Sequence, residues 1–114
     1  MRVHYLEIVT PEVEATCASL AAQHGTSFSR PEPALGGARL AQLDGGGRVG
    51  VRAPLRDTET PVVRPYRLVD SLDAALDHAR AAGAEVAMEA TPIAGHGTFA
   101  IYILGGIEHG LWQL

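Results

Sequence analysis

The sequence contains no lysine and has a formal net charge of −4, so it lacks the basic cluster that binds a phosphate backbone or an anionic lipid surface. Nucleic acid and membrane are therefore not expected as partners. Aromatic residues make up only 5% of the chain and are scattered along it, which also argues against a stacking platform for single strands. No apolar run approaches the length of a transmembrane helix.

Cysteine is scarce as well, because Cys17 stands alone. A single thiol forms neither an internal disulfide nor a multi-thiolate metal site. Its place on the apolar stripe of a predicted helix indicates a core residue. The chain opens without a basic segment followed by an apolar stretch, so a cytoplasmic location is expected. A length of 114 residues predicts one domain.

The first half of the sequence alternates between strand and helix signals. Residues Val3 to Val9 are rich in β-forming side chains, and Thr10-Pro11-Glu12 is typical of a helix N-terminus. Apolar residues then recur at helical spacing until His24-Gly25. Three further strands are expected at residues 27–29, 38–43 and 48–53.

The second half repeats this order. A strand is expected from Val62 to Val69, and Ser71 can cap a helix that ends before Gly83. Strands at 84–88, 98–104 and 108–114 follow, with a loop over 91–97. Glycines recur at a constant offset of about 60 residues, as in Gly37 with Gly97 and Gly50 with Gly110.

These patterns predict an α+β fold in a single domain, residues 1–114, made of two tandem βαβββ modules at about 1–54 and 62–114. Each module exposes an apolar sheet face, so the two modules are expected to pair and to leave a concave cavity.

Three segments carry a family resemblance. The helix starts at Thr10–Ala15 and Val69–Leu76 resemble the strand-to-helix junctions of the vicinal oxygen chelate superfamily, which includes glyoxalase, bleomycin-resistance and dioxygenase proteins. The closing Gly110-Leu111-Trp112-Gln113 resembles its carboxylate-Leu-Trp pattern. The resemblance implies a glyoxalase-like paired-sheet fold, and commonly a homodimer.

The resemblance also locates four metal-ligand positions, and this sequence departs from the family there. Gly110 and Gly50 stand where metal-dependent relatives have carboxylates, and the opening strands offer His4, or Tyr5 with a register slip, and Arg64. One imidazole beside a guanidinium supplies too few donors for a divalent ion. We therefore expect a member with a degenerate metal site, without a metal or another cofactor.

Strand alternation selects the candidate ligand-binding residues. Tyr5 and Glu7 share one face of the first strand, opposite Leu6 and Ile8, although the repeat offset would instead turn His4 inward. Arg64 and Tyr66 share one face of the fifth strand, with Arg67 on the other. A plain ion pair between Glu7 and Arg64 is the alternative to a role for Glu7 as general base.

The closing strand adds Trp112, which shares a face with Glu108 and Gly110, whereas His109 is expected to face the helix layer. The missing side chain at Gly110 would leave room for a flat ligand beside the indole, unless Trp112 is simply core. His96, between Gly95 and Gly97, is either a ligand contact or an ordinary loop residue.

Three hypotheses follow. The first is a metal-independent small-molecule binding protein that contacts a small organic ligand through the six candidates: Tyr5, Glu7, Arg64, Tyr66, His96 and Trp112. The alternative is a glyoxalase-like lyase, isomerase or dioxygenase-related enzyme, with Glu7 or His96 as base and Arg64 steadying an anionic group. The third is a subunit whose sheets serve mainly for dimerisation. The sequence identifies no ligand.

Overall fold

The computed structural model describes all residues from Met1 to Leu114 and contains seven β-strands, two α-helices and one short 3-10 helix. The chain forms two compact units. Unit 1 comprises Met1–His4 and Arg64–Leu114, and unit 2 comprises Tyr5–Val63. The predicted α+β class is confirmed. No helix is long and apolar enough to cross a bilayer.

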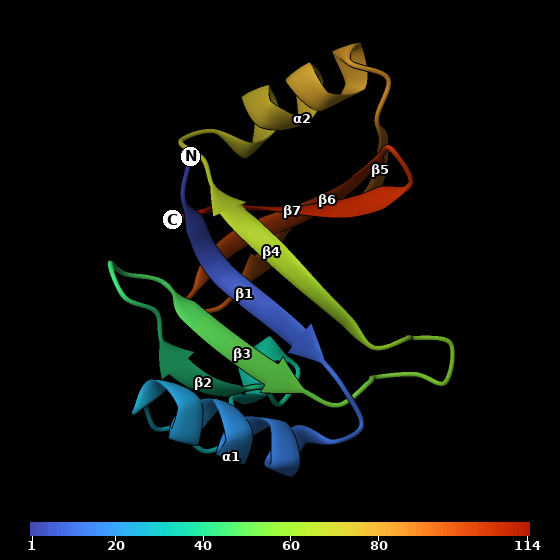
Figure 1. The fold of residues 1–114 in the computed structure, drawn as a ribbon. Coiled ribbons are helices and arrows are strands. Elements are labelled where there is room, and N and C mark those ends of the chain that lie inside the picture. Colours follow the sequence, from blue (N-terminus) through green and yellow to red (C-terminus); the bar gives the residue numbers. More distant parts are fainter. The chain divides into compact units, whose positions relative to one another are not determined.

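Unit 2 is a three-stranded sheet with one helix (Figure 1). Strand β3 is central, pairing antiparallel with β2 and parallel with β1, and α1 lies against β3. Cys17 is the buried residue of α1, as expected. The elements of this half are β1 (Val3–Val9, whose first residues belong to unit 1), α1 (Val13–His24), η1 (Pro33–Leu35), β2 (Arg39–Gln42) and β3 (Arg48–Arg52).

Helix α1 ends where predicted but begins later. Gly25 closes it in the left-handed conformation, with φ 62°. At the other end the hydroxyl of Thr10 accepts a hydrogen bond from the Glu12 amide at 3.1 Å, and Glu12 itself is non-helical with ψ 55°. The expected cap therefore organises a turn ahead of the helix, and the helix proper starts at Val13.

The predicted strand at 27–29 is wrong, so the first half has three regular strands instead of four. Ser29 nevertheless lies beside β2, because its amide donates to the Leu40 carbonyl at 2.8 Å and its hydroxyl accepts from the Leu40 amide at 3.0 Å. Pro31 and Pro33 follow and have no amide hydrogen to extend this pairing. A side-chain hydrogen bond thus replaces the ladder of a fourth strand.

Unit 1 has the full βαβββ order that the sequence predicts. Its strands lie in the order β4-β7-β6-β5, with β4 parallel to β7, and α2 packs on one face (Figure 1). Ser71 caps α2 by accepting from the Ala74 amide at 3.1 Å. The elements are β4 (Val62–Leu68, whose first residues belong to unit 2), α2 (Leu72–Ala81), β5 (Glu85–Ile93), β6 (Gly97–Leu104) and β7 (Ile107–Gln113).

The core of unit 1 lies between α2 and its sheet, where Leu72 and Leu76 of the helix meet Ala100 and Leu111 of the strands. Tyr102 packs against this cluster. Because β7 alternates, Leu111 on the helix side leaves Gly110 and Trp112 on the opposite face.

Strand β5 is longer than predicted, and it replaces part of the expected 91–97 loop. Its register shifts twice against β6, between Val86 and Met88 and between Met88 and Thr91. Such irregularities let pairing continue past a break in the alternating pattern. The connection to β6 therefore shrinks to residues 94–96.

Candidate functional site

Gly50 and Gly110, which the resemblance places at carboxylate positions, are buried, and a tyrosine ring fills the space beside each. A β-carbon at Gly50 would lie 1.8 Å from the Tyr5 hydroxyl oxygen. A β-carbon at Gly110 would lie 2.5 Å from Cδ2 of Tyr66. Neither glycine has a positive φ, so close approach of the tyrosines, and not backbone conformation, accounts for them.

This arrangement corrects one expectation. The missing side chain at Gly110 does not leave room for a flat ligand, because Tyr66 pairs with Gly110 across the parallel β4 and β7 strands and its ring occupies that room. The same relation holds in unit 2, where Tyr5 covers Gly50. Tyr5 and Tyr66 are only 3% and 4% exposed.

The residues present do not fit the divalent metal that the fold family implies. Glycine supplies no side-chain donor at either carboxylate position, and the adjacent space is taken by phenol rings. No group of three or more histidine, cysteine, aspartate or glutamate side chains in the chain is arranged to hold a metal ion.

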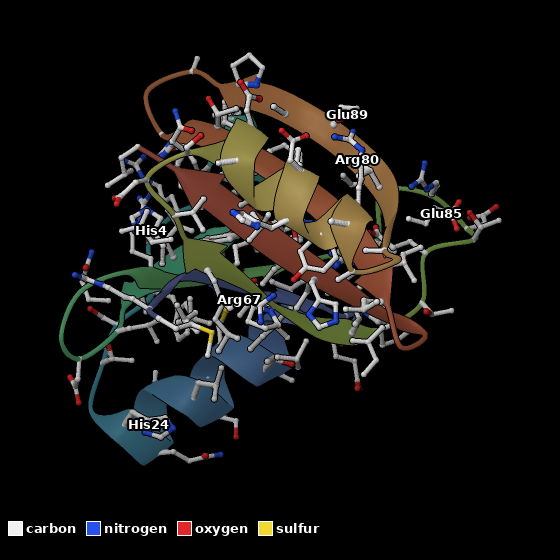
Figure 2. The ribbon with its side chains drawn as sticks, turned by 90° about the horizontal axis from the view of Figure 1, so that it is seen from above. His4, His24, Arg67, Arg80, Glu85 and Glu89 are labelled. Carbon is white, nitrogen blue, oxygen red and sulfur yellow. The ribbon has the colours of Figure 1, made fainter.

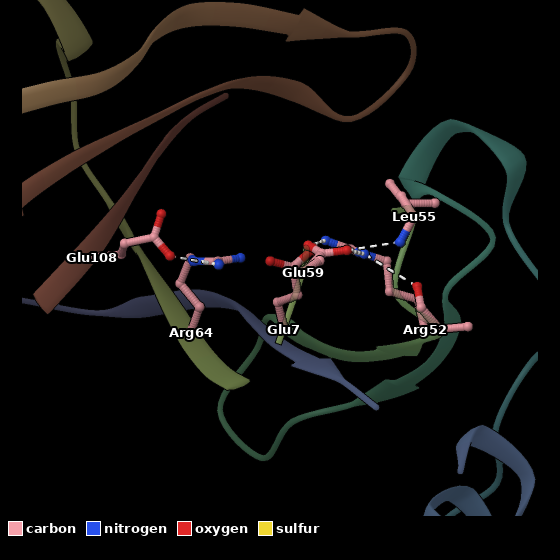
Figure 3. Close-up of polar contacts among 7 residues, drawn as sticks. Glu7, Arg52, Leu55, Glu59, Arg64 and Glu108 are labelled. Carbon is pink, nitrogen blue, oxygen red and sulfur yellow. Dashed lines mark hydrogen bonds and ion pairs between the residues drawn. The ribbon is translucent and has the colours of Figure 1, made fainter. Parts of the chain in front are cut away.

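Unit 2 contains a buried cluster of three charged side chains (Figure 3). Arg52 donates from Nε to Oε2 of Glu7 at 2.9 Å. Its Nη1 and Nη2 donate to the two carboxylate oxygens of Glu59, each at 2.8 Å. The Arg52 guanidinium therefore donates to both carboxylates at once. Its hydrogen bond from Nε fixes the direction of the Glu7 side chain.

The same cluster organises the segment after β3. Glu59 also accepts from the Leu55 amide at 2.8 Å, and Arg52 Nη1 donates to the Ala53 carbonyl at 3.2 Å. The polar stretch from Arg56 to Thr60, which the sequence indicates as a connector, is thus fastened to β3 through Glu59.

Ionisation in unit 2 follows from these contacts. Hydrogen bonding to Glu59 raises the pKa of Arg52 even though burial opposes its charge, so the guanidinium stays charged. Burial raises the pKa of Tyr5 well above its ordinary value, and the neighbouring Glu7 carboxylate adds to that shift. Tyr5 is therefore a neutral phenol at ordinary pH.

In unit 1, Arg64 is buried and its Nη2 donates to Oε1 of the half-exposed Glu108 at 2.8 Å (Figure 3). The pair joins β4 to β7 on the face opposite α2. This ion pair confirms that Arg64 and Glu108 share a face.

An aromatic cluster lies on the same face of unit 1, around Trp112. The Tyr66 ring meets the indole edge-on at 5.8 Å between centroids. Phe99 and His4 lie 6.4 Å and 5.4 Å from the indole. His4 thus joins this cluster, as the repeat offset suggests, and Phe99 is an aromatic neighbour that the sequence did not single out.

His96 reaches the cluster through its backbone. The indole Nε1 of Trp112 donates to the His96 carbonyl at 2.8 Å. Gly97 follows with φ 113°, and a β-carbon there would lie 2.5 Å from the Gln113 carbonyl oxygen, so only glycine fits. Trp112 is 1% exposed, which places its ring in the core and leaves its polar group already satisfied.

The structure confirms which side chains of β4 and β7 were predicted to share a face of the sheet. Arg67 donates to Tyr102 and His109, away from Arg64 and Tyr66. His109 stacks on Tyr102, which packs against the helix-side core. His109 therefore faces the helix layer, as alternation predicts.

The six candidates fall into two groups. Tyr5 and Glu7 lie in unit 2, and Arg64, Tyr66, His96 and Trp112 lie in unit 1. Sequence reasoning missed Arg52 and Glu59. The parity of β3 places Arg52 on the same face as Gly50, so Arg52 could have been found there, but nothing local marks Glu59.

The fold is of the vicinal oxygen chelate type. Similar solved structures include methylmalonyl-CoA epimerase from Mycobacterium tuberculosis, with a TM-score of 0.76 and 17% identity over 98% of this chain and 87% of that chain. The hypothetical protein BH1468 from Bacillus halodurans C-125 has a TM-score of 0.76 and 13% identity, over 99% of this chain and 94% of that one.

A Streptomyces coelicolor methylmalonyl-CoA epimerase carrying E43L is also similar, with a TM-score of 0.71 and 17% identity over 99% of this chain and 94% of that chain. In sequence, the chain matches no protein family model and no curated protein. At these identities the likeness establishes the fold.

Proposed function

We propose that this chain is a metal-independent small-molecule binding protein of the glyoxalase/bleomycin-resistance type, with a degenerate metal site. The observation that carries the proposal is the pairing of Tyr5 with Gly50 and of Tyr66 with Gly110. Neither position has a side-chain donor, and an aromatic ring fills the space beside each, so a divalent metal would find no ligand there.

The aromatic cluster of unit 1 indicates the kind of ligand. His4 and Phe99 are half-buried, and their rings lie beside the fully buried Trp112. A ligand would reach these partly exposed rings first, and the buried Tyr66 and Trp112 would support them from below. We propose a flat, largely apolar organic ligand, because stacking on such rings contributes most when both surfaces are planar.

The test combines composition and binding. Native mass spectrometry of protein purified without chelator should show no stoichiometric divalent metal, and chelator should leave the melting temperature unchanged. One zinc, nickel, iron or manganese ion per chain would contradict the metal-independent proposal.

Binding is measured through Trp112, the only tryptophan. Titration with a panel of flat aromatic compounds should give saturable changes in its fluorescence, and Phe99→Ala should weaken them. Phe28→Ala, which alters the only other phenylalanine, in unit 2, is the matched control. A panel without any saturable response would count against this ligand class.

A second candidate is an acid/base enzyme, and the geometry of Glu7 favours it specifically. Glu7 is 7% exposed, and its carboxylate is oriented by the hydrogen bond from Arg52, as a positioned base would need. The epimerases among the similar structures are consistent with it. Glu7→Gln or His96→Ala should then abolish turnover or deuterium exchange of a bound compound while binding persists; exchange that survives both changes would exclude this candidate.

We also propose a homodimer, since β5 ends the sheet of unit 1 and an edge strand is often covered by a second subunit. Sedimentation equilibrium should give twice the chain mass. A monomer at high concentration would refute this assembly.

A further inference from the structure

The helix-side face of unit 1 holds a second polar cluster, centred on Arg67 of β4. Nη2 of Arg67 donates to the Tyr102 hydroxyl at 2.9 Å and to Nδ1 of His109 at 3.2 Å. The Tyr102 and His109 rings stack in parallel, 4.9 Å apart. Figure 2 labels Arg67, which comes from β4.

Arg67 has no acidic partner, unlike four other arginines of the chain. Arg39, Arg52, Arg64 and Arg80 each have a carboxylate within ion-pair distance. The contacts of Arg67 are instead the side chains of Tyr102 and His109 and the sulfur of Met1, 4.0 Å from Nη1. A half-buried guanidinium without a counter-charge favours an anion, because burial weakens the screening by water.

His109 has a hydrogen-bond partner at each of its two ring nitrogens. A guanidinium only donates, so Nδ1 of His109 accepts, and its Nε2 carries the proton and donates to the Leu104 carbonyl at 3.2 Å. These two contacts hold the His109 ring in place beside Arg67.

Tyr102 supplies a further donor. Its oxygen accepts from Arg67, which leaves the hydroxyl hydrogen directed elsewhere. Donation from Arg67 also polarises this hydroxyl and strengthens the bond that it can donate. Arg67 Nε and the second hydrogen of Nη1 are the remaining donors of the guanidinium.

We propose that Arg67 and Tyr102, held in place by His109, form a binding site for a small oxyanion, a phosphoryl or carboxylate group. The guanidinium provides the charge, and the Tyr102 hydroxyl provides a second, directional hydrogen bond. The site lies on the helix side of the unit 1 sheet, opposite the Trp112 cluster, and is independent of the proposed ligand there.

The experiment is a titration of the full chain with inorganic phosphate, with acetate and with chloride at constant ionic strength, followed by the nitrogen-proton signals of Arg67 Nε and the His109 amide. Phosphate or acetate should shift them saturably and chloride should not. Saturation by phosphate alone assigns a phosphoryl group, by acetate alone a carboxylate, and by both a general oxyanion; saturation by neither overturns the proposal.

Two arginine variants separate the site from general electrostatics. Arg67→Gln should weaken binding by about tenfold or more. Arg56→Gln removes the same charge from an exposed arginine of unit 2 and should leave the affinity unchanged. Equal affinities in Arg67→Gln and the unmodified chain would overturn the proposal. If Arg67→Gln does not fold, Tyr102→Phe decides, since it should weaken binding, and an unchanged affinity refutes the site.

Discussion

Tyr5 stands where a side chain at Gly50 would have to be, with its hydroxyl oxygen 1.8 Å from the position of the missing β-carbon. Tyr66 and Gly110 repeat this relation in the other half of the sequence. In each unit the glycine lies on a strand parallel to the tyrosine's own strand. The same packing of a tyrosine ring against a glycine on a parallel strand therefore occurs in both units.

Gly50→Ala is therefore expected to destabilise the fold by about 1–3 kcal/mol, because an alanine there forces the Tyr5 ring to move. Urea denaturation measures the free energy of unfolding. Tyr5→Leu combined with Gly50→Ala should recover part of the loss, and strictly additive effects would show that the two residues do not clash.

Arg52→Met should cost about 3–5 kcal/mol of unfolding free energy, because it removes a buried cation that pairs with both the Glu7 and the Glu59 carboxylate. Arg39→Met is the matched control. Arg39 also pairs with a carboxylate, but its partner Glu14 is 78% exposed, so the loss should stay within about 1 kcal/mol. If the two variants lose similar amounts of unfolding free energy, burial does not explain the contribution of the Arg52 ion pairs.

Alkaline pH should destabilise the protein through Tyr5. Burial raises its pKa above the ordinary 10.0, so the unfolded chain loses this proton at a lower pH than the folded chain. The contribution of Tyr5 to stability is complete below pH 10 and is lost above it, by about 1.4 kcal/mol per pH unit. Tyr5→Phe should show a shallower decline between pH 10 and 11, and identical slopes would contradict this account.

Trp112→Phe should cost about 1–3 kcal/mol, because it removes the hydrogen bond to the His96 carbonyl and leaves the core underpacked. Hydrogen exchange should then speed up in the loop 94–96 that the indole holds. Phe28→Leu in unit 2 should leave that exchange unchanged. Full protection of the loop in Trp112→Phe would show that the indole does not anchor it.

Local patterns in the sequence predicted most of the helices and strands. They also predicted which face of the sheet each side chain of β4 and β7 occupies, because alternation and helix caps depend on near neighbours. The exceptions depended on pairing across strands. Glu7 meets Arg52 because β1 and β3 run parallel in a particular register, which residues 45 positions apart do not reveal. Pairing between distant strands also explains the wrong expectation of open space beside Gly110. Tyr66 of β4, which pairs with Gly110 of β7, fills that space.

The strand at 27–29 failed for a different reason. Of its three residues only Phe28 is a strong β-former, and Pro31 and Pro33, just beyond the segment, have no amide hydrogen to extend the pairing that Ser29 makes. The length of β5 was missed because its two irregularities hide a continuous strand from any pattern based on strict alternation.

The first four residues have a consequence for any attempt to divide this protein. The Arg2 carbonyl accepts from the Leu68 amide at 2.8 Å, and the His4 ring lies against Trp112. The compact units therefore differ from the sequence repeats at their borders: Met1–His4, from the first repeat, belong to unit 1, and Val62 and Val63, from the second repeat, belong to unit 2. A fragment that begins at Arg64 would lack the peptide that completes its own sheet and aromatic cluster. Supplying residues 1–4 in trans, or grafting them ahead of that fragment, would be needed for it to fold by itself.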